Sequence, residues 1–208
     1  MAKIDSVFQS EALRRAWSYI KPWVVFVVVL LVLRYTGALS GLSVLTGKAL
    51  MKTGIMDIKP EEPAVAKKFN YNFKIKDLNG KVLDVKDLKG RTIFLNLWAT
   101  WCGPCRMEMP SIQSLYNQVD NKKIMFIMLS IDRESDIEKI KSYIKDKEYT
   151  FPVYMAASLL PNQLQVGMIP STFVVDSAGR VVATEKGAAN YDTPQFKAFL
   201  EKLIQPAN

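Results

Sequence analysis

Residues 92–110 read TIFLNLWATWCGPCRMEMP, and this stretch decides the expected fold. Residues 92–98 are mostly apolar, β-branched or aromatic, which is typical of a strand covered on both faces. Cys102 and Cys105 follow at once, and apolar residues then recur at helical spacing over 104–119. A buried strand that leads into a helix predicts an α/β domain with the cysteines at the carboxyl end of the strand, where chemistry gathers in such sheets.

The pattern around this stretch alternates between strands and helices. Further strands are expected at 124–131, 151–154, 172–175 and 181–184, and further helices at 135–147, at 159–164 and from Pro194 onward. Before the stretch, alternation over 71–75, the turn signal Asn79-Gly80 and the apolar return at 82–85 predict a β-hairpin. This order specifies a three-layer α/β/α domain with a mixed sheet and an N-terminal hairpin extension over residues 69–208.

An apolar run near the N-terminus predicts a membrane anchor. Residues 17–33 read WSYIKPWVVFVVVLLVL, in which Lys21 is the only charge, and Arg34 closes the run. At ~1.5 Å per residue a helix of this length spans ~25 Å, the short end of what a bilayer requires. Basic residues within 1–16 favour a cytoplasmic N-terminus. We therefore expect a single signal-anchor helix at 17–34, with the following domain on the outer side of the membrane.

The alternatives to an uncleaved anchor are a buried core helix, a cleaved signal peptide and a lipoprotein anchor. A core helix is disfavoured, because residues 23–33 are eleven unbroken apolar residues flanked by Trp and basic residues. A cleaved signal peptide stays open, because Thr36-Gly37-Ala38 offers small residues for cleavage, although Arg34 lies where such a peptide should be uncharged. A lipoprotein anchor is excluded, because both cysteines lie far downstream. Residues 35–68, which include Pro60-Glu61-Glu62-Pro63, are predicted to be a linker.

Composition excludes several classes of function. The 208 residues carry a net charge of +8, of which +5 lies in residues 1–60 and only +3 in residues 61–208. Since the larger part has no basic block interleaved with aromatic residues, we expect no nucleic-acid partner. Histidine is absent, which removes Cys-His and Ser-His-Asp nucleophiles together with the commonest metal ligand.

The motif Cys102-Gly103-Pro104-Cys105 predicts redox chemistry. A helix N-terminus directs unpaired N–H groups and partial positive charge at the first sulfur, which favours the thiolate of Cys102. Cys105, one turn further, is suited to resolving a mixed disulfide. Half a zinc site is disfavoured because no other Cys or His is present, so no metal is expected. A purely structural bridge is also possible, but one that closes so short a loop stabilises a fold only weakly.

Two longer motifs carry a family resemblance. Residues 94–110 (FLNLWATWCGPCRMEMP) and 167–182 (GMIPSTFVVDSAGRVV), together with the N-terminal anchor, resemble the membrane-anchored thioredoxin-like proteins of the TlpA/ResA type. The resemblance implies a thioredoxin fold, with Ile169-Pro170 as a cis-proline loop packed against the sulfurs. It also implies a bacterial cytoplasmic (inner) membrane location, single-pass, with the catalytic domain facing the periplasm or the extracellular side.

Other site residues follow from the resemblance. Trp98 and Trp101 resemble the aromatic pair that flanks the thioredoxin dithiol, and Asn96 stands where thioredoxin carries a buried aspartate. Glu108, one helical turn after Cys105, resembles the carboxylate that ResA-type proteins place near the dithiol, where it would transfer the proton of Cys105. The alternative for Glu108 is an ordinary solvated helix residue.

These features predict a thiol-disulfide oxidoreductase that needs no cofactor beyond the Cys102/Cys105 disulfide. The Gly103-Pro104 dipeptide is the one that thioredoxin uses, so we expect a reductant of disulfides in exported proteins, with apocytochromes c as candidate substrates by resemblance. A membrane thiol-reducing protein would supply electrons. The alternatives are a non-catalytic thioredoxin-like scaffold and a peroxidase of the peroxiredoxin branch, although the peroxidase motif is absent.

Overall fold

The computed structural model describes part of the chain, namely residues 17, 19–29, 54, 56–58 and 67–204. The chain divides into two compact units, Met1–Ala49 and Leu50–Asn208. In the first unit, residues 17 and 19–29 are helical. Across the described ranges, no helix is both long enough and apolar enough to cross a membrane. The rest of the expected anchor, residues 18 and 30–34, lies outside these ranges, as do residues 1–16, so the anchor stays a prediction.

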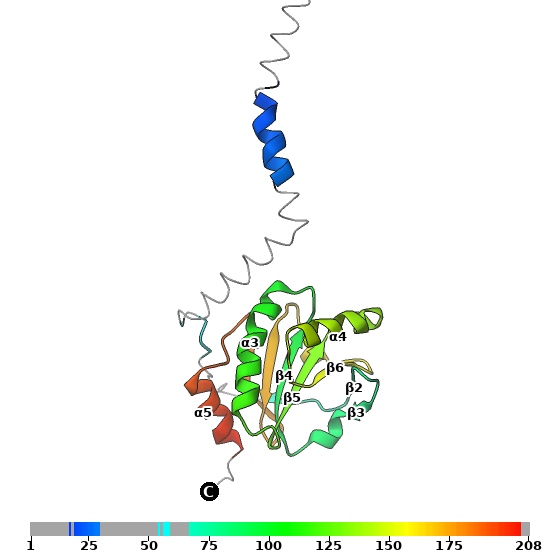
Figure 1. The fold of residues 1–208 in the computed structure, drawn as a ribbon. Coiled ribbons are helices and arrows are strands. Elements are labelled where there is room, and N and C mark those ends of the chain that lie inside the picture. The colour runs from blue at the N-terminus through cyan, green and yellow to red at the C-terminus, as the bar shows by residue number, and fades with distance from the viewer. Residues whose placement is uncertain (1–16, 18, 30–53, 55, 59–66, 205–208) are drawn as a thin grey trace, which may run out of the picture. The chain divides into compact units, whose positions relative to one another are not determined.

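The second unit is built on one mixed sheet of eight strands (Figure 1). Its elements in chain order are β1 (Lys67–Lys68), β2 (Lys74–Asp77), β3 (Val82–Asp84), η1 (Val85–Leu88), β4 (Thr92–Trp98), α3 (Gly103–Gln118), β5 (Ile124–Ser130), η2 (Glu134–Asp136), α4 (Ile137–Asp146), β6 (Val153–Ala156), η3 (Asn162–Leu164), β7 (Ser171–Val175), β8 (Arg180–Lys186) and α5 (Pro194–Leu203). The strand order is β1-β8-β7-β4-β5-β6-β2-β3. β4, β5 and β6 are parallel and the other pairings are antiparallel, so the predicted mixed sheet is confirmed.

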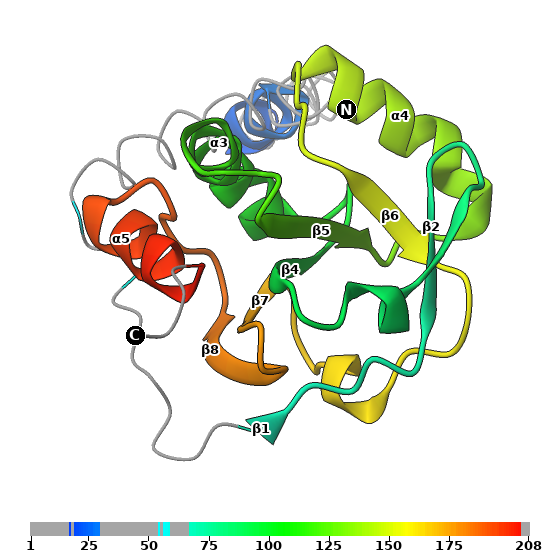
Figure 2. The ribbon, with the colours of Figure 1, turned by 90° about the horizontal axis from the view of Figure 1, so that it is seen from below.

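The α-helices of this unit share one face of the sheet. Met109 of α3, Ile140 of α4 and Phe196 of α5 belong to the same buried cluster as Phe94 and Trp98 of β4. Figure 2 shows the three helices along one side of the strands. All seven residues of β4 are buried, as its apolar pattern predicts.

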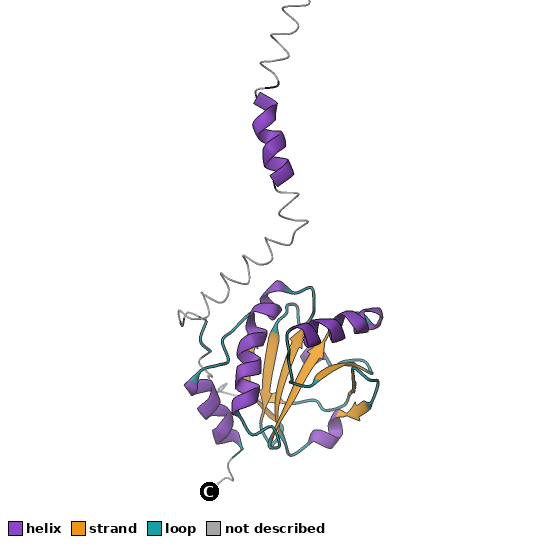
Figure 3. Cartoon of the chain, in the orientation of Figure 1, coloured by secondary structure: helices purple, strands orange, loops and turns teal. Residues whose placement is uncertain are grey.

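The opposite face is covered without any α-helix among the described residues. There Leu95 of β4 packs in a second cluster with Phe73, with Val85 of η1 and with Leu164 of η3. The predicted three-layer α/β/α arrangement is therefore wrong in its third layer, which short 3-10 turns and extended chain supply (Figure 3). The reason is topological: β4, β5 and β6 are successive parallel neighbours, and right-handed crossovers in one direction place α3 and α4 on the same side.

The N-terminal hairpin is confirmed, and the folded unit begins earlier than Phe69. β2 and β3 pair antiparallel around a turn in which Gly80 has φ +87°, and β2 extends the sheet from β6. Lys67 pairs with Val181, and Ile58 is buried in the core. Described parts of the predicted linker, residues 35–68, thus belong to the sheet and the core.

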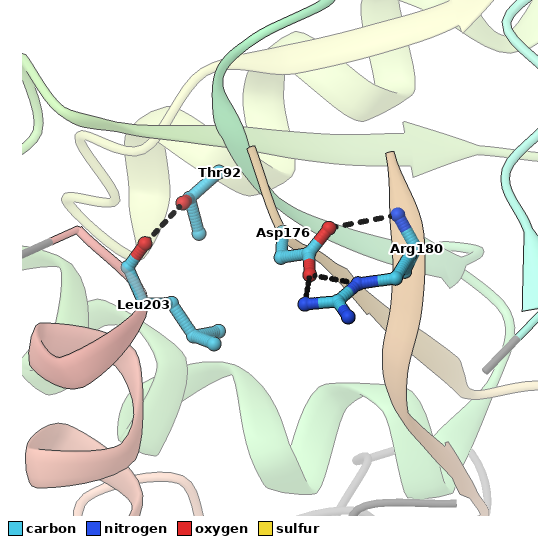
Figure 4. A network of polar contacts seen from close by, with 4 residues as sticks. All are labelled: Thr92, Asp176, Arg180 and Leu203. Carbon is cyan, nitrogen blue, oxygen red and sulfur yellow. Dashed lines mark hydrogen bonds and ion pairs between the residues drawn. The ribbon is translucent and has the colours of Figure 1, made fainter. Parts of the chain in front are cut away.

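The hairpin of β7 and β8 is closed by a buried carboxylate. Asp176 accepts hydrogen bonds from the backbone N–H of Arg180 at 2.8 Å and from its Nε at 2.7 Å, as Figure 4 shows. In the same view, Thr92 at the start of β4 donates to the carbonyl of Leu203 at 3.3 Å. These contacts fix the end of the sheet remote from the cysteines and attach α5 to it.

Candidate functional site

The two cysteines lie where β4 passes into α3, and they form a disulfide. Cys102 is the N-cap of α3, and its Sγ accepts a hydrogen bond from the backbone N–H of Cys105 at 3.2 Å. Pro104 lies in the first turn, where its missing N–H costs no helical bond. Cys105 is fully buried and Cys102 is 5% exposed, so an incoming substrate can reach only the Cys102 side.

The cis-proline loop is confirmed. The Ile169-Pro170 peptide bond is cis, and the carbonyl oxygen of Ile169 lies 3.9 Å from Cys102 Sγ. The loop is held on both sides: Ser171 Oγ donates to the carbonyl of Met168 at 2.9 Å, and the N–H of Gly187 donates to the carbonyl of Pro170 at 2.9 Å. A loop positioned in this way presents backbone groups next to the reactive sulfur.

The two tryptophans occupy different environments. Trp98 is fully buried and its ring lies 5.9 Å from that of Tyr143, whereas Trp101 is 63% exposed. Gly103 and Pro104 are exposed beside the disulfide. Trp98 therefore supports the site from within the core, while Trp101, Gly103 and Pro104 form the surface that a partner would meet.

Glu108 is fully buried, so the alternative of a solvated helix residue is wrong. Its Oε1 accepts a hydrogen bond from Asn96 Nδ2 at 2.7 Å, and its Oε2 accepts one from the N–H of Ala189 at 3.2 Å. Loss of hydration raises the pKa of Glu108 to about 8, the two hydrogen bonds oppose this rise, and the nearby carboxylate of Glu185 adds to it. A pKa in this range means that the protonated and the carboxylate forms of Glu108 are both present near neutral pH.

A polar network extends from Glu108 across the sheet. Asn96 Nδ2 also donates to Thr172 Oγ1 at 2.9 Å, and Tyr191 OH donates to the same oxygen at 2.6 Å. Asn96 and Thr172 face each other in the register of β4 and β7. Sequence reasoning missed Thr172 and Tyr191 because their partners lie far away in the chain.

Asp132 is a second buried carboxylate that sequence reasoning missed. Its Oδ2 accepts from the N–H of Thr100 at 2.9 Å and from Ser130 Oγ at 2.7 Å, and its Oδ1 accepts from Thr100 Oγ1 at 2.7 Å. Asp132 therefore holds the turn that immediately precedes Cys102. Its position just after an expected strand was the available signal, since such strand ends carry functional groups.

Comparison with known proteins assigns the family. A family model described as the AhpC/TSA family matches residues 65–184. The chain belongs to this family. The chain is 37% identical over 133 residues to the thiol-disulfide oxidoreductase ResA of Bacillus cereus (strain ZK / E33L), and the alignment covers 64% of this chain and 75% of that protein. The resemblance inferred from the two motifs is thereby confirmed.

Solved structures share the fold of this AhpC/TSA domain. The crystal structure of StoA from Bacillus subtilis matches with a TM-score of 0.50 and 23% identity, over 66% of this chain and 98% of that one. A thioredoxin family thiol:disulfide interchange protein from Chlorobium tepidum TLS matches with a TM-score of 0.52 and 23% identity, over 72% and 99%. The fold is thioredoxin-like.

The chemistry of the site rests on the cysteine pair. Over the residues that the structure describes, no group of three or more Cys, Asp or Glu side chains is arranged to hold a metal ion. The disulfide is the oxidised state of a two-electron couple.

Proposed function

We propose that the protein is a thiol-disulfide oxidoreductase that reduces disulfides in exported proteins through Cys102 and Cys105. One observation carries the proposal: the sulfur of Cys102 caps α3 and lies 3.9 Å from the carbonyl oxygen of Ile169 in the cis-proline loop. The helix terminus stabilises a thiolate there, and the loop can hold an extended chain beside it. The ResA relative bears the name of the same activity.

The reduced protein would react in two exchange steps. The Cys102 thiolate attacks a substrate disulfide, forms a mixed disulfide and releases one substrate thiolate. The Cys105 thiolate then attacks Cys102 Sγ, which closes the intramolecular disulfide and releases the second substrate thiolate. Two electrons pass to the substrate, and the protein ends in the state that the structure shows.

Glu108 is proposed to transfer the proton of Cys105. It lies one helical turn after Cys105, is fully buried, and has a pKa raised to about 8 by loss of hydration. Proton transfer is most efficient when the pKa of the acid lies near the working pH. A carboxylate could accept the proton when Cys105 is needed as a thiolate and return it when the disulfide is reduced.

The direction of electron flow is proposed from the residues between the cysteines. Gly103-Pro104 is the thioredoxin dipeptide, and the reference reduction potentials are about −270 mV for thioredoxin and about −120 mV for the oxidant DsbA. We expect a potential on the thioredoxin side of about −170 mV. A higher measured potential would instead indicate an oxidant or an isomerase.

The location and the partners are part of the same proposal. The apolar run at 17–33 and the basic residues before it favour a single anchor in the bacterial cytoplasmic membrane, with the domain on the outer side. A thiol-reducing membrane protein would recharge the dithiol, and apocytochromes c are candidate substrates. Protease added to intact protoplasts should digest the domain but leave residues 1–16, whereas protection of the domain would contradict the orientation.

Insulin reduction tests catalysis directly. The wild type should turn over with dithiothreitol as reductant, and Cys102→Ser should abolish turnover, because the remaining thiol, Cys105, is fully buried and cannot attack a substrate disulfide. If both are inactive yet still bind a partner, the protein is a scaffold, and peroxide consumption without insulin reduction would indicate a peroxidase. Cys105→Ala should accumulate a mixed disulfide at Cys102, from which the partner can be identified.

A further inference from the structure

A second surface feature lies beside the cis-proline loop, on the face of the sheet opposite α3, α4 and α5. It is a pocket of about 710 Å³, which we call the β7–β8 pocket. Phe173 and Val181, both buried, form its apolar base, and Val166 and Met168 add apolar wall. Its polar lining comes from Lys67, Gln163, Gln165, Gly167, Thr184 and Lys186.

One end of the β7–β8 pocket adjoins the cis-proline loop. Met168 adjoins Ile169, whose carbonyl lies 3.9 Å from Cys102 Sγ. Lys186 pairs in register with Ser171, the residue directly after the cis-proline. An extended polypeptide advances ~3.3 Å per residue, so a chain joined to Cys102 would reach the pocket within a few residues of its own cysteine.

Both charged side chains that the described residues contribute to the pocket are lysines. Lys67 and Lys186 are exposed, and among the described residues no Asp or Glu lines the pocket and neither lysine takes part in an ion pair. The carboxylate of Glu185 does not neutralise these lysines, because it lies on the opposite face of the sheet. Glu185 is the cross-strand neighbour of Thr172, and the side chain of Thr172 contacts Asn96 on that opposite face. An apolar base below two cations is complementary to a segment that combines an aliphatic side chain with a carboxylate.

We propose that the β7–β8 pocket binds the residues that flank the reactive cysteine of a disulfide substrate, and that it selects acidic segments with an aliphatic residue. The inference rests on the proposed function and adds a substrate class to it. The apolar base would take the aliphatic side chain, and Lys186 and Lys67 would contact Asp or Glu. The preference would act before chemistry, by holding the substrate in position for attack by Cys102.

The test uses the full-length reduced protein and disulfide-linked fluorogenic peptides that differ only in the residues flanking the cysteine, Leu-Asp or Leu-Lys. The wild type should reduce the acidic peptide with a kcat/KM about tenfold higher, and the preference should shrink in high salt. Lys186→Glu should reverse it, and Lys67→Glu should weaken it. The matched control Lys139→Glu, an exposed charge on α4, should leave it unchanged.

A small neutral substrate separates this inference from the proposed function. All these variants should reduce hydroxyethyl disulfide at the wild-type rate, because it is too small to reach the pocket. If the wild type does not reduce it, the proposed function fails. If reduction is normal but both peptides react equally, or Lys186→Glu leaves their ratio unchanged, the pocket does not select substrates. Loss of binding to anionic vesicles in Lys186→Glu with an unchanged peptide ratio would assign the lysines to a lipid surface and overturn the inference.

Discussion

Replacing Glu108 by Gln should remove a specific pH dependence of stability. In the folded protein loss of hydration raises the pKa of Glu108 from the ordinary value of 4.5 to about 8. Between these two values the folded protein holds a proton that the unfolded chain releases. The contribution of this proton to the unfolding free energy is therefore complete below pH 4.5 and declines as the pH rises toward 8. It declines because the unfolded chain binds fewer protons than the folded protein across that window.

The size of the effect follows from the shift. One pKa unit corresponds to about 1.4 kcal/mol, so the interval from 4.5 to about 8 corresponds to at most about 5 kcal/mol of unfolding free energy. Glu108 is fully buried, and solvent therefore screens little of this difference. Gln carries no titrating group, so its unfolding free energy should lack this slope.

Urea unfolding from pH 5 to pH 8 measures the difference, with the disulfide kept intact so that no thiol titrates. Relative to Glu108→Gln, the wild type should lose stability at up to about 1.4 kcal/mol per pH unit. Glu138→Gln is the matched control, since the same exchange is made at an exposed position of α4, and its curve should follow the wild type. Parallel curves for the wild type and Glu108→Gln would refute the reasoning.

Three further predictions concern stability. Asp132→Asn should lower the unfolding free energy by about 1–3 kcal/mol, because buried hydrogen bonds to a carboxylate are lost, and urea unfolding that matches the wild type would contradict the role assigned to Asp132. Trp98→Ala should lower the unfolding free energy by about 3–5 kcal/mol, because it leaves a cavity in the core. Trp101→Ala, at an exposed position, should change the thermal unfolding temperature little. Equal effects of the two substitutions would contradict the difference in burial. Gly179→Ala should destabilise by more than about 1 kcal/mol, because φ is +78° and a Cβ would lie 3.3 Å from the Tyr71 ring, whereas Gly80→Ala meets open space and should cost less in the same assay.

Local patterns predicted the reactive centre well. The strand at 92–98, the helix after it and the cysteine pair at their junction are determined by neighbouring residues, and the structure confirms all three. The cis-proline at Pro170 was reached by resemblance of a motif, and it is also confirmed. These features depend on short-range geometry, so residues that are close together in the sequence determine them.

Features that depend on strand register were not predictable in this way. The partner of Asn96 at Thr172 is 76 residues away, and the N–H of Ala189 that contacts Glu108 is 81 residues from it. Burial of Glu108 follows from these pairings, because its place in α3 alone is compatible with a solvated side chain. The wrong prediction of a helical third layer has the same origin, since the side of the sheet on which a helix packs depends on the spatial order of the strands.

Residues 92–110 alone predict that two cysteines lie at the start of a helix and can form a redox-active disulfide. Tertiary packing decides the environment of those sulfurs: a buried carboxyl group whose pKa is raised to about 8, and a lysine-lined pocket beside the cis-proline loop. The physical reason is that hydration and charge are properties of a three-dimensional neighbourhood. Strands distant in the chain must pair before a side chain loses its water or meets another charge.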